Sequence, residues 1–318
     1  VGSLPRVPDE GGGTRAGPPG CLGVVDQRRR RRPDGPTGNR HPETAQYRPT
    51  RERRRSVAVD RRVDRGEHLP LAGTTLAVKD NIDVAGLATT AACPAFAYEP
   101  ASDAPAVRAL TDAGAVVVGK ANMDQFATGL VGTRSPHGAC PNAHWPELVA
   151  GGSSSGSAVA VAAGLVGLAL GTDTAGSGRV PAAANGIVGV KPTRGRISTV
   201  GVVPACRSLD CVSVFARSVE LAVRAADLAA ATPIGADDPW RRSAPRAPTP
   251  PTAGRLRVGV PVPGGLTFDG DPSGEARFDA AVRTLVATGC ETVPVDLDPF
   301  LEVGRLLYHG SFVAERYE

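Results

Sequence analysis

The sequence is short of aromatic residues, of lysine and of long apolar segments. Aromatic residues make up only 4% of the 318 residues, so aliphatic side chains and alanine must fill most of the core. No segment approaches the roughly 20 consecutive apolar residues that cross a bilayer, and the N-terminus lacks the apolar core of a secretory signal. These absences argue against a membrane or secreted protein, and we expect a soluble protein of the cytoplasm.

Cysteine and histidine are sparse and poorly placed for metal binding. The six cysteines form no C-x-x-C pair, and no nearby histidine completes a zinc-binding set. The five histidines are badly placed for a serine-histidine-acid triad. We therefore expect free thiols in a reducing compartment, no bound metal, and a general base other than histidine.

Positive charge is concentrated at the N-terminus. Residues 1–70 contain 16 arginines and 9 acidic residues, a net charge of +7, whereas the rest of the chain has 20 basic and 23 acidic residues, a net charge of −3. The arginine runs lie among glycine and proline without a helical or alternating apolar period, so we predict a disordered leader over residues 1–67. Two origins stay open, a native arm and a frame-shifted reading of a GC-rich gene. Because no aromatic residues interleave the arginines, we expect no nucleic-acid partner, although a basic arm for RNA or DNA is the competing hypothesis.

From about residue 69 the pattern becomes the alternation of strands and helices typical of an α/β fold. We expect a domain over residues 68–318. The expected strands cover 75–78, 115–118, 167–170, 187–190, 255–260 and 291–295, and the expected helices cover 104–113, 155–166 and 275–288. Residues 232–254 are rich in proline, alanine and arginine, so we predict a long surface connection there.

A lysine at the end of an apolar run is the candidate base. Lys79 follows Leu76-Ala77-Val78, which reads as a strand that delivers the amine into a cleft. Burial without a counter-charge lowers the pKa of a lysine, by up to ~5 units when complete, so the amine can be neutral and accept a proton. The alternative is an ordinary lysine at a strand end beside Asp80, with its amine in solvent.

Two glycine-rich segments carry the candidate nucleophile. They read GGSSSGS over residues 151–157 and GTDTAGSGR over residues 171–179. Ser177 follows a predicted strand in a loop where flanking glycines allow tight turns. Successive backbone N–H groups in such a loop can converge on one point and form an oxyanion hole, for which the candidates are Thr174, Ala175, Gly176 and Ser177. An ordinary strand-to-helix turn is the alternative reading of this loop taken alone.

The first segment also fits the G-x-S-x-G nucleophile elbow of α/β-hydrolases. That elbow requires a strand directly before it, but Trp145-Pro146-Glu147 leaves little room for one. It also requires a later acid and then a histidine, for which His309 is the only candidate. We therefore set this reading aside.

Together, Lys79 and the two serine segments resemble the amidase signature family. The two serines at 153 and 177 are 24 residues apart, and the lysine lies 74 residues before the first of them, spacings that match the family. The resemblance implies that Ser177 is the nucleophile, that Ser153 follows a cis peptide bond and bridges to the base, and that Lys79 is the base. It also implies a mixed central sheet with helices on both faces, here incomplete, and catalysis without metal or organic cofactor.

Within the family the resemblance narrows to the allophanate hydrolases. It rests on TTAACPAF at 89–96, GSGRVP at 176–181 and VPACRSLDC at 203–211, and it extends over residues 69 to 318. Allophanate is a small carboxylated urea, so its pocket needs a cation. Tyr308 and Arg316 resemble the family's substrate clamp and are eight residues apart, which would place them on one face of a helix. A bidentate Arg316 and the Tyr308 hydroxyl would suit a carboxylate, although a surface arginine and a half-buried tyrosine are the plainer reading.

The resemblance implies a hydrolase that releases ammonia from allophanate in urea degradation. The competing hypotheses are a general amidase, the A subunit of an amidotransferase and an inactive fragment, since the first two would share the Ser-Ser-Lys triad. The chain stops soon after Arg316, where relatives continue, so we expect a catalytic domain that is truncated at its C-terminus. The expected partner is a small-molecule amide substrate, and because relatives often dimerise, a homodimer is the expected assembly.

Overall fold

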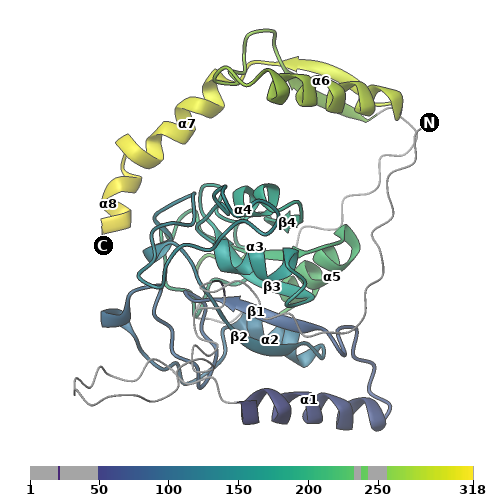
Figure 1. Ribbon diagram of the computed structural model, residues 1–318, viewed down its shortest axis with the longest axis vertical. Coiled ribbons are helices and arrows are strands. Elements are labelled where there is room, and N and C mark those ends of the chain that lie inside the picture. The colour runs from purple at the N-terminus through teal and green to yellow at the C-terminus, as the bar shows by residue number, and fades with distance from the viewer. Residues whose placement is uncertain (1–20, 22–48, 233–237, 243–255, 318) are drawn as a thin grey trace. The chain divides into compact units, whose positions relative to one another are not determined.

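The computed structural model describes residues 21, 49–232, 238–242 and 256–317, and the chain divides into two compact units, residues 1–242 and 243–318 (Figure 1). Most of the predicted leader and much of the predicted connection at 232–254 lie outside the described residues. The first unit contains α1 (Pro49–Asp64), β1 (Thr75–Lys79), α2 (Pro105–Asp112), β2 (Val116–Ala121), α3 (Ser155–Ala162), β3 (Leu168–Asp173), α4 (Arg179–Ala184), β4 (Val188–Val190), β5 (Cys211–Ala216) and α5 (Val219–Ala230), with short 3₁₀ turns at Pro94–Phe96 and Gln125–Ala127.

Five strands of the first unit form one mixed sheet, as the family resemblance implies. Their order is β2-β1-β3-β5-β4, in which β1 runs parallel to β2 and β3, whereas β5 runs antiparallel to β3 and β4. All five strands lie within the first unit. The parallel strands β1 and β3 end at the same edge of the sheet, and that edge therefore collects the side chains that follow them.

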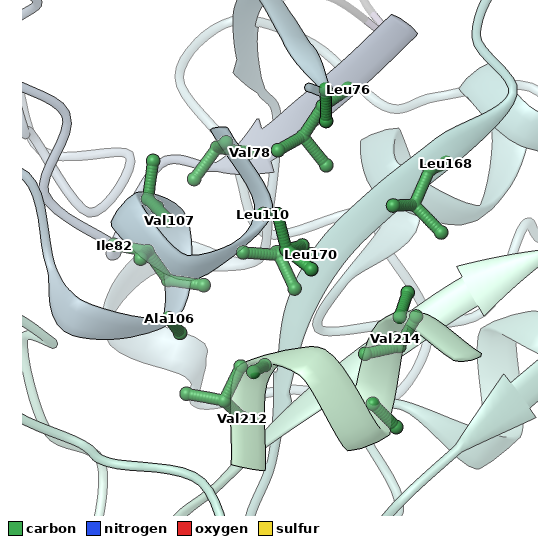
Figure 2. Packing of buried hydrophobic residues seen from close by; sticks show 14 of the residues in the cluster. Leu76, Val78, Ile82, Ala106, Val107, Leu110, Leu168, Leu170, Val212 and Val214 are labelled. Carbon is green, nitrogen blue, oxygen red and sulfur yellow. The ribbon is translucent and has the colours of Figure 1, made fainter. Parts of the chain in front are cut away.

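Alternating side chains of these strands form two cores, one on each face of the sheet. Leu76 and Val78 of β1 point to one face, where α2 and α5 pack against them, whereas Ala77 points to the other face, where α3 and α4 pack. Figure 2 shows the first of these clusters, with side chains from β1, α2, β3 and β5 gathered together. The predicted helices on both faces are confirmed.

Helix α1 corrects the prediction of disorder for part of the leader. Residues 50–64 contain neither glycine nor proline, and arginine, alanine and glutamate are good helix formers, so a helix can form there despite the arginine runs. Pro49 opens it at a position where its missing N–H costs nothing. The helix is attached to the sheet unit through Arg62, whose Nη2 donates to Asp112 O at 2.9 Å, and through Val59, which is buried.

The second unit is a small β-α-β element followed by two helices. Strands β6 (Arg257–Pro261) and β7 (Glu291–Val295) pair in parallel and are joined by α6 (Pro272–Ala287), close to the segments predicted from the sequence. Asp271 caps α6 by accepting a hydrogen bond from the Ser273 N–H. Helices α7 (Asp298–His309) and α8 (Phe312–Tyr317) follow. None of the helices described in either unit is long and apolar enough to span a membrane.

Candidate active site

Lys79 is the last residue of β1 and is 0% exposed, as the hypothesis of a buried base requires. Its Nζ donates to Ser153 Oγ at 2.8 Å and to Thr172 Oγ1 at 2.7 Å. Burial lowers the pKa of Lys79 to about 7, although the nearby carboxylates, Asp124 foremost, work in the opposite direction. The amine is therefore neutral in a large fraction of molecules at neutral pH, and the alternative of a solvent-exposed lysine is wrong.

Ser153 is buried and follows the cis peptide bond between Gly152 and Ser153 that the resemblance implied. The Asp124 N–H donates to Ser153 O at 3.1 Å, and the Gly152 N–H donates to Leu130 O at 2.8 Å. A Cβ at position 152 would collide with Asp124 Oδ2, so this position accepts only glycine without a shift of its neighbours. These contacts hold the Ser153 hydroxyl beside the amine of Lys79.

Ser177 lies between β3 and α4 and is 4% exposed. The Ser154 N–H donates to Ser177 O at 3.3 Å, so the backbones of the two serine segments are adjacent. Among the described residues, however, no hydrogen bond involves Ser177 Oγ. The structure thus joins Lys79 to Ser153, whereas the step from Ser153 to Ser177 stays a prediction.

The Asp173 carboxylate holds the loop that carries Ser177. Its oxygens accept from the Gly176 N–H at 2.8 Å, from the Gly178 and Arg179 N–H groups at 3.1 Å, and from Arg179 Nε at 2.9 Å. Burial opposes ionisation, but the Arg179 guanidinium and the backbone amides outweigh it and lower the pKa of Asp173. Asp173 is therefore a charged anchor beneath the loop.

This anchor also contacts the predicted oxyanion hole. The N–H of Gly176 donates to Asp173 Oδ1 at 2.8 Å, a contact that shapes the loop, and the role of Gly176 as an oxyanion donor stays a prediction. Within the described part of the chain, the N–H groups of Thr174, Ala175 and Ser177 make no hydrogen bond, and their role as oxyanion donors stays a prediction. The Thr174 hydroxyl donates to Asp210, a buried carboxylate that also accepts from the Ala205 and Cys206 N–H groups.

Asp124, Asp210 and Thr172 are neighbours of the site to which the sequence analysis assigned no role. Burial raises the pKa of Asp210, against the lowering effect of its hydrogen bonds and of Lys79. Asp124 is buried and accepts from the Gly132 and Arg134 N–H groups, so it fixes the loop that precedes Ser153. Thr172 is a polar residue at the end of a predicted buried strand, and this position could have marked it as part of the site. Nothing in the sequence pattern singled out Asp124.

Tyr308 and Arg316 belong to the second unit, and their role as a substrate clamp stays a prediction. The expected single helix is wrong, because α7 ends at His309 and α8 begins at Phe312. Gly310 closes α7 in an extended conformation, which interrupts the helical spacing between the two residues. Tyr308 is 57% exposed, and Arg316 Nη1 donates to Leu307 O at 3.4 Å.

The segment before Gly151 does not have the geometry of a nucleophile elbow. No strand leads into Gly151, since the residues before it form only an isolated bridge between Pro141 and Val149, so a nucleophile elbow is absent there. Among the described residues, no group of three or more histidine, cysteine, aspartate or glutamate side chains could hold a metal ion.

Comparison with known proteins gives consistent matches. The family model described as Amidase matches residues 45–317. The urea amidolyase of Saccharomyces cerevisiae is 52% identical over 252 residues, which cover 79% of this chain and 14% of that protein. A glutamyl-tRNA(Gln) amidotransferase subunit of Symbiobacterium thermophilum is 42% identical over 272 residues, 83% of this chain and 54% of that protein.

A solved structure of Kluyveromyces lactis allophanate hydrolase superposes with a TM-score of 0.78 at 48% identity, covering 83% of this chain and 43% of that one. The chain therefore spans less than half of that solved chain and about a seventh of the yeast urea amidolyase.

Proposed function

Because the chain belongs to the amidase family, we propose that it hydrolyses allophanate to ammonia and carbon dioxide by a Ser-cis-Ser-Lys mechanism. The hydrogen bond from the buried Lys79 Nζ to Ser153 Oγ at 2.8 Å is the observation that carries the mechanism. The choice of substrate is supported by the similarity to urea amidolyase and to allophanate hydrolase. Residues 68–318 are the catalytic domain in this proposal.

The proposed reaction begins with a proton relay. Neutral Lys79 accepts the proton of Ser153 Oγ, and Ser153 Oγ takes the proton of Ser177 as the Ser177 oxygen attacks the amide carbon. Free N–H groups of the Thr174–Ser177 loop stabilise the oxyanion, for which each lost donor typically costs ~3 kcal/mol of transition-state stabilisation. The carbon–nitrogen bond breaks, and the leaving nitrogen takes the proton from Lys79 by way of Ser153 to depart as ammonia.

Deacylation repeats these steps with water. Water attacks the acyl carbon and gives a proton to Lys79 by way of Ser153. The bond from that carbon to Ser177 Oγ then breaks, Ser177 Oγ takes the proton back through the same relay, and the carboxylated product breaks down. One allophanic acid and one water yield two ammonia and two carbon dioxide, so the reaction balances without an oxidant or a reductant. The clamp of Tyr308 and Arg316 would hold the substrate carboxylate in this scheme.

Location and assembly form the less specific part of the proposal. The six cysteines form no C-x-x-C pair in the sequence, which fits a reducing compartment, and we infer a cytoplasmic location. A homodimer is the proposed assembly and can be measured by light scattering.

The test is ammonia release from allophanate, compared with glutamine, indole-acetamide and propionamide. Allophanate should be turned over with the highest kcat/KM. A preference for a neutral amide would favour a general amidase. A preference for glutamine would favour an amidotransferase subunit, like the relative from Symbiobacterium thermophilum. Ser177→Ala should abolish release. Ser157→Ala is the matched control, because Ser157 is also a buried serine and its hydroxyl donates to Leu170 O, outside the proposed relay.

A further inference from the structure

The Thr172 hydroxyl lies between two buried polar side chains. Its Oγ1 accepts from Lys79 Nζ at 2.7 Å and from Asn81 Nδ2 at 3.3 Å. Thr172 is 3% exposed and Asn81 is 1% exposed. The amine of Lys79 therefore contacts two hydroxyl groups, Ser153 on the side of the reaction and Thr172 on the side of Asn81.

The orientation of the Asn81 amide is determined by its second partner. Nδ2 also donates to Val203 O at 3.1 Å, and a carbonyl oxygen can only accept. The NH₂ group must therefore face both Val203 and Thr172. Among the described residues, Asn81 Oδ1 is buried without a hydrogen-bond partner. An unpaired buried acceptor is destabilising, and an apolar side chain of similar size would avoid it, so this position needs the donors of asparagine.

These contacts determine where the hydrogens of Thr172 and Lys79 point. When Asn81 and Lys79 both donate to Thr172 Oγ1, the two lone pairs of that oxygen are occupied and its O–H is directed elsewhere. A neutral amine has two N–H groups and one lone pair. With one N–H directed at Thr172, the lone pair can face Ser153, which is the orientation that proton transfer from Ser153 needs.

We propose that Asn81 is a positioning residue for the base and that it acts through Thr172. By holding the Thr172 oxygen as an acceptor, Asn81 keeps the Lys79 lone pair directed at Ser153. Without Asn81 the Thr172 hydroxyl is free to rotate and to donate its own proton to the amine, which would occupy that lone pair. This inference rests on the proposed function, in which Lys79 is the base.

Its first test needs no substrate. The sequence has three lysines, Lys79, Lys120 and Lys191, so lysine labelled with ¹³C at the ε position gives three signals, and Lys79→Met assigns one of them. The titration midpoint of the Lys79 signal is measured in wild type, Asn81→Leu, Thr172→Val and the double variant. Thr172→Val should lower the midpoint, because the ammonium loses an acceptor.

The inference is decided by whether the effects of the two substitutions on the Lys79 midpoint depend on each other. Asn81→Leu should move the Lys79 midpoint when Thr172 is present and leave it unchanged in the Thr172→Val background. Equal shifts in both backgrounds would overturn the inference. If Asn81→Leu does not fold, Asn81→Ala replaces it in the same cycle. Thr89→Val is the matched control, because Thr89 Oγ1 is the acceptor of the other buried lysine, Lys120, at 3.0 Å, and its loss should leave the Lys79 midpoint in place.

The second test uses turnover of allophanate. Asn81→Leu should lower kcat about tenfold with KM unchanged, the effect of about one hydrogen bond, and should have no further effect in the Thr172→Val background. Thr172→Ser should restore the activity that Thr172→Val loses. An increase in KM alone would contradict a role in positioning the base. If the wild type does not hydrolyse allophanate but the two substitutions are coupled in their effect on the Lys79 midpoint, the proposed function fails and the positioning role stands. If the wild type hydrolyses allophanate but the two substitutions are not coupled, the positioning role fails and the proposed function stands.

Discussion

Replacing Lys79 by methionine tests the energetic cost of burying an amine beside the hydroxyl groups of Ser153 and Thr172. Lys79 is 0% exposed, and burial lowers its pKa from 10.5 to about 7. Between these two values the unfolded chain binds more protons than the folded chain, so the free energy of unfolding rises with pH across this range. Methionine has a similar length and no charge, and the variant therefore lacks this dependence.

The size of the effect follows from the two pKa values. Relative to an unburied lysine, Lys79 lowers the free energy of unfolding by about 4 kcal/mol at pH 7 and by about 2 kcal/mol at pH 9. The hydrogen bonds that the variant loses to Ser153 and Thr172 add a contribution that depends little on pH in this range. The stability difference between Lys79→Met and wild type should therefore move by about 2 kcal/mol in favour of wild type from pH 7 to pH 9.

Urea unfolding followed by circular dichroism at pH 7, 8 and 9 measures this difference. Ser177→Ala is the control, since it changes the same site without removing a charge, and its stability difference from wild type should be constant over these pH values. A Lys79→Met difference that is also constant would show that the amine titrates as in solvent and would refute the reasoning from burial.

Three further predictions concern activity and the loop anchor. Because Lys79 must be neutral to act, kcat/KM for allophanate should rise with pH up to about 7 and level off above it; a profile that is flat from pH 5 to 8 would argue against this base. Asp173→Asn should lower the free energy of unfolding by about 3 kcal/mol at pH 7 in urea titrations, and the difference should shrink below about pH 4, because a lowered carboxyl pKa stabilises only above the unfolded value. Arg316→Gln should raise KM for allophanate at least about tenfold and leave KM for propionamide unchanged, and equal increases for both amides would contradict the carboxylate clamp.

Elements with a strong apolar pattern were predictable from the sequence. The run ending at Lys79 and the segment 291–295 were located almost to the residue, because alternating or continuous apolar residues between turn signals favour a strand. Strand β5 was missed. Its sequence, CVSVFA, has a serine at position 213 that is buried because the strand lies between β3 and β4. The segment can therefore be recognised as a buried strand only when these two neighbours are known. Helix α1 was missed because arginine runs near glycine and proline have the composition of a disordered segment.

The site was predictable only in part, because its contacts join residues that are far apart in the chain. Thr172 Oγ1 accepts a hydrogen bond from Lys79, 93 residues away, and no local pattern encodes that contact. The contact of the Gly176 N–H with the Asp173 carboxylate was not predictable for a related reason: a glycine-rich loop shows that backbone amides can converge, but not which carboxylate accepts from them. The family resemblance did imply the contact between Lys79 and Ser153, which the structure contains as a hydrogen bond.

Labelling with a fluorophosphonate tests the central claim most directly, since this reagent reports an activated serine without requiring the natural substrate. One adduct should form, and mass spectrometry of the digested protein should place it on Ser177 in wild type. Labelling should be lost in Ser177→Ala and strongly slowed in Lys79→Met. An adduct on another serine, or undiminished labelling of Lys79→Met, would contradict a nucleophile activated by Lys79 through Ser153.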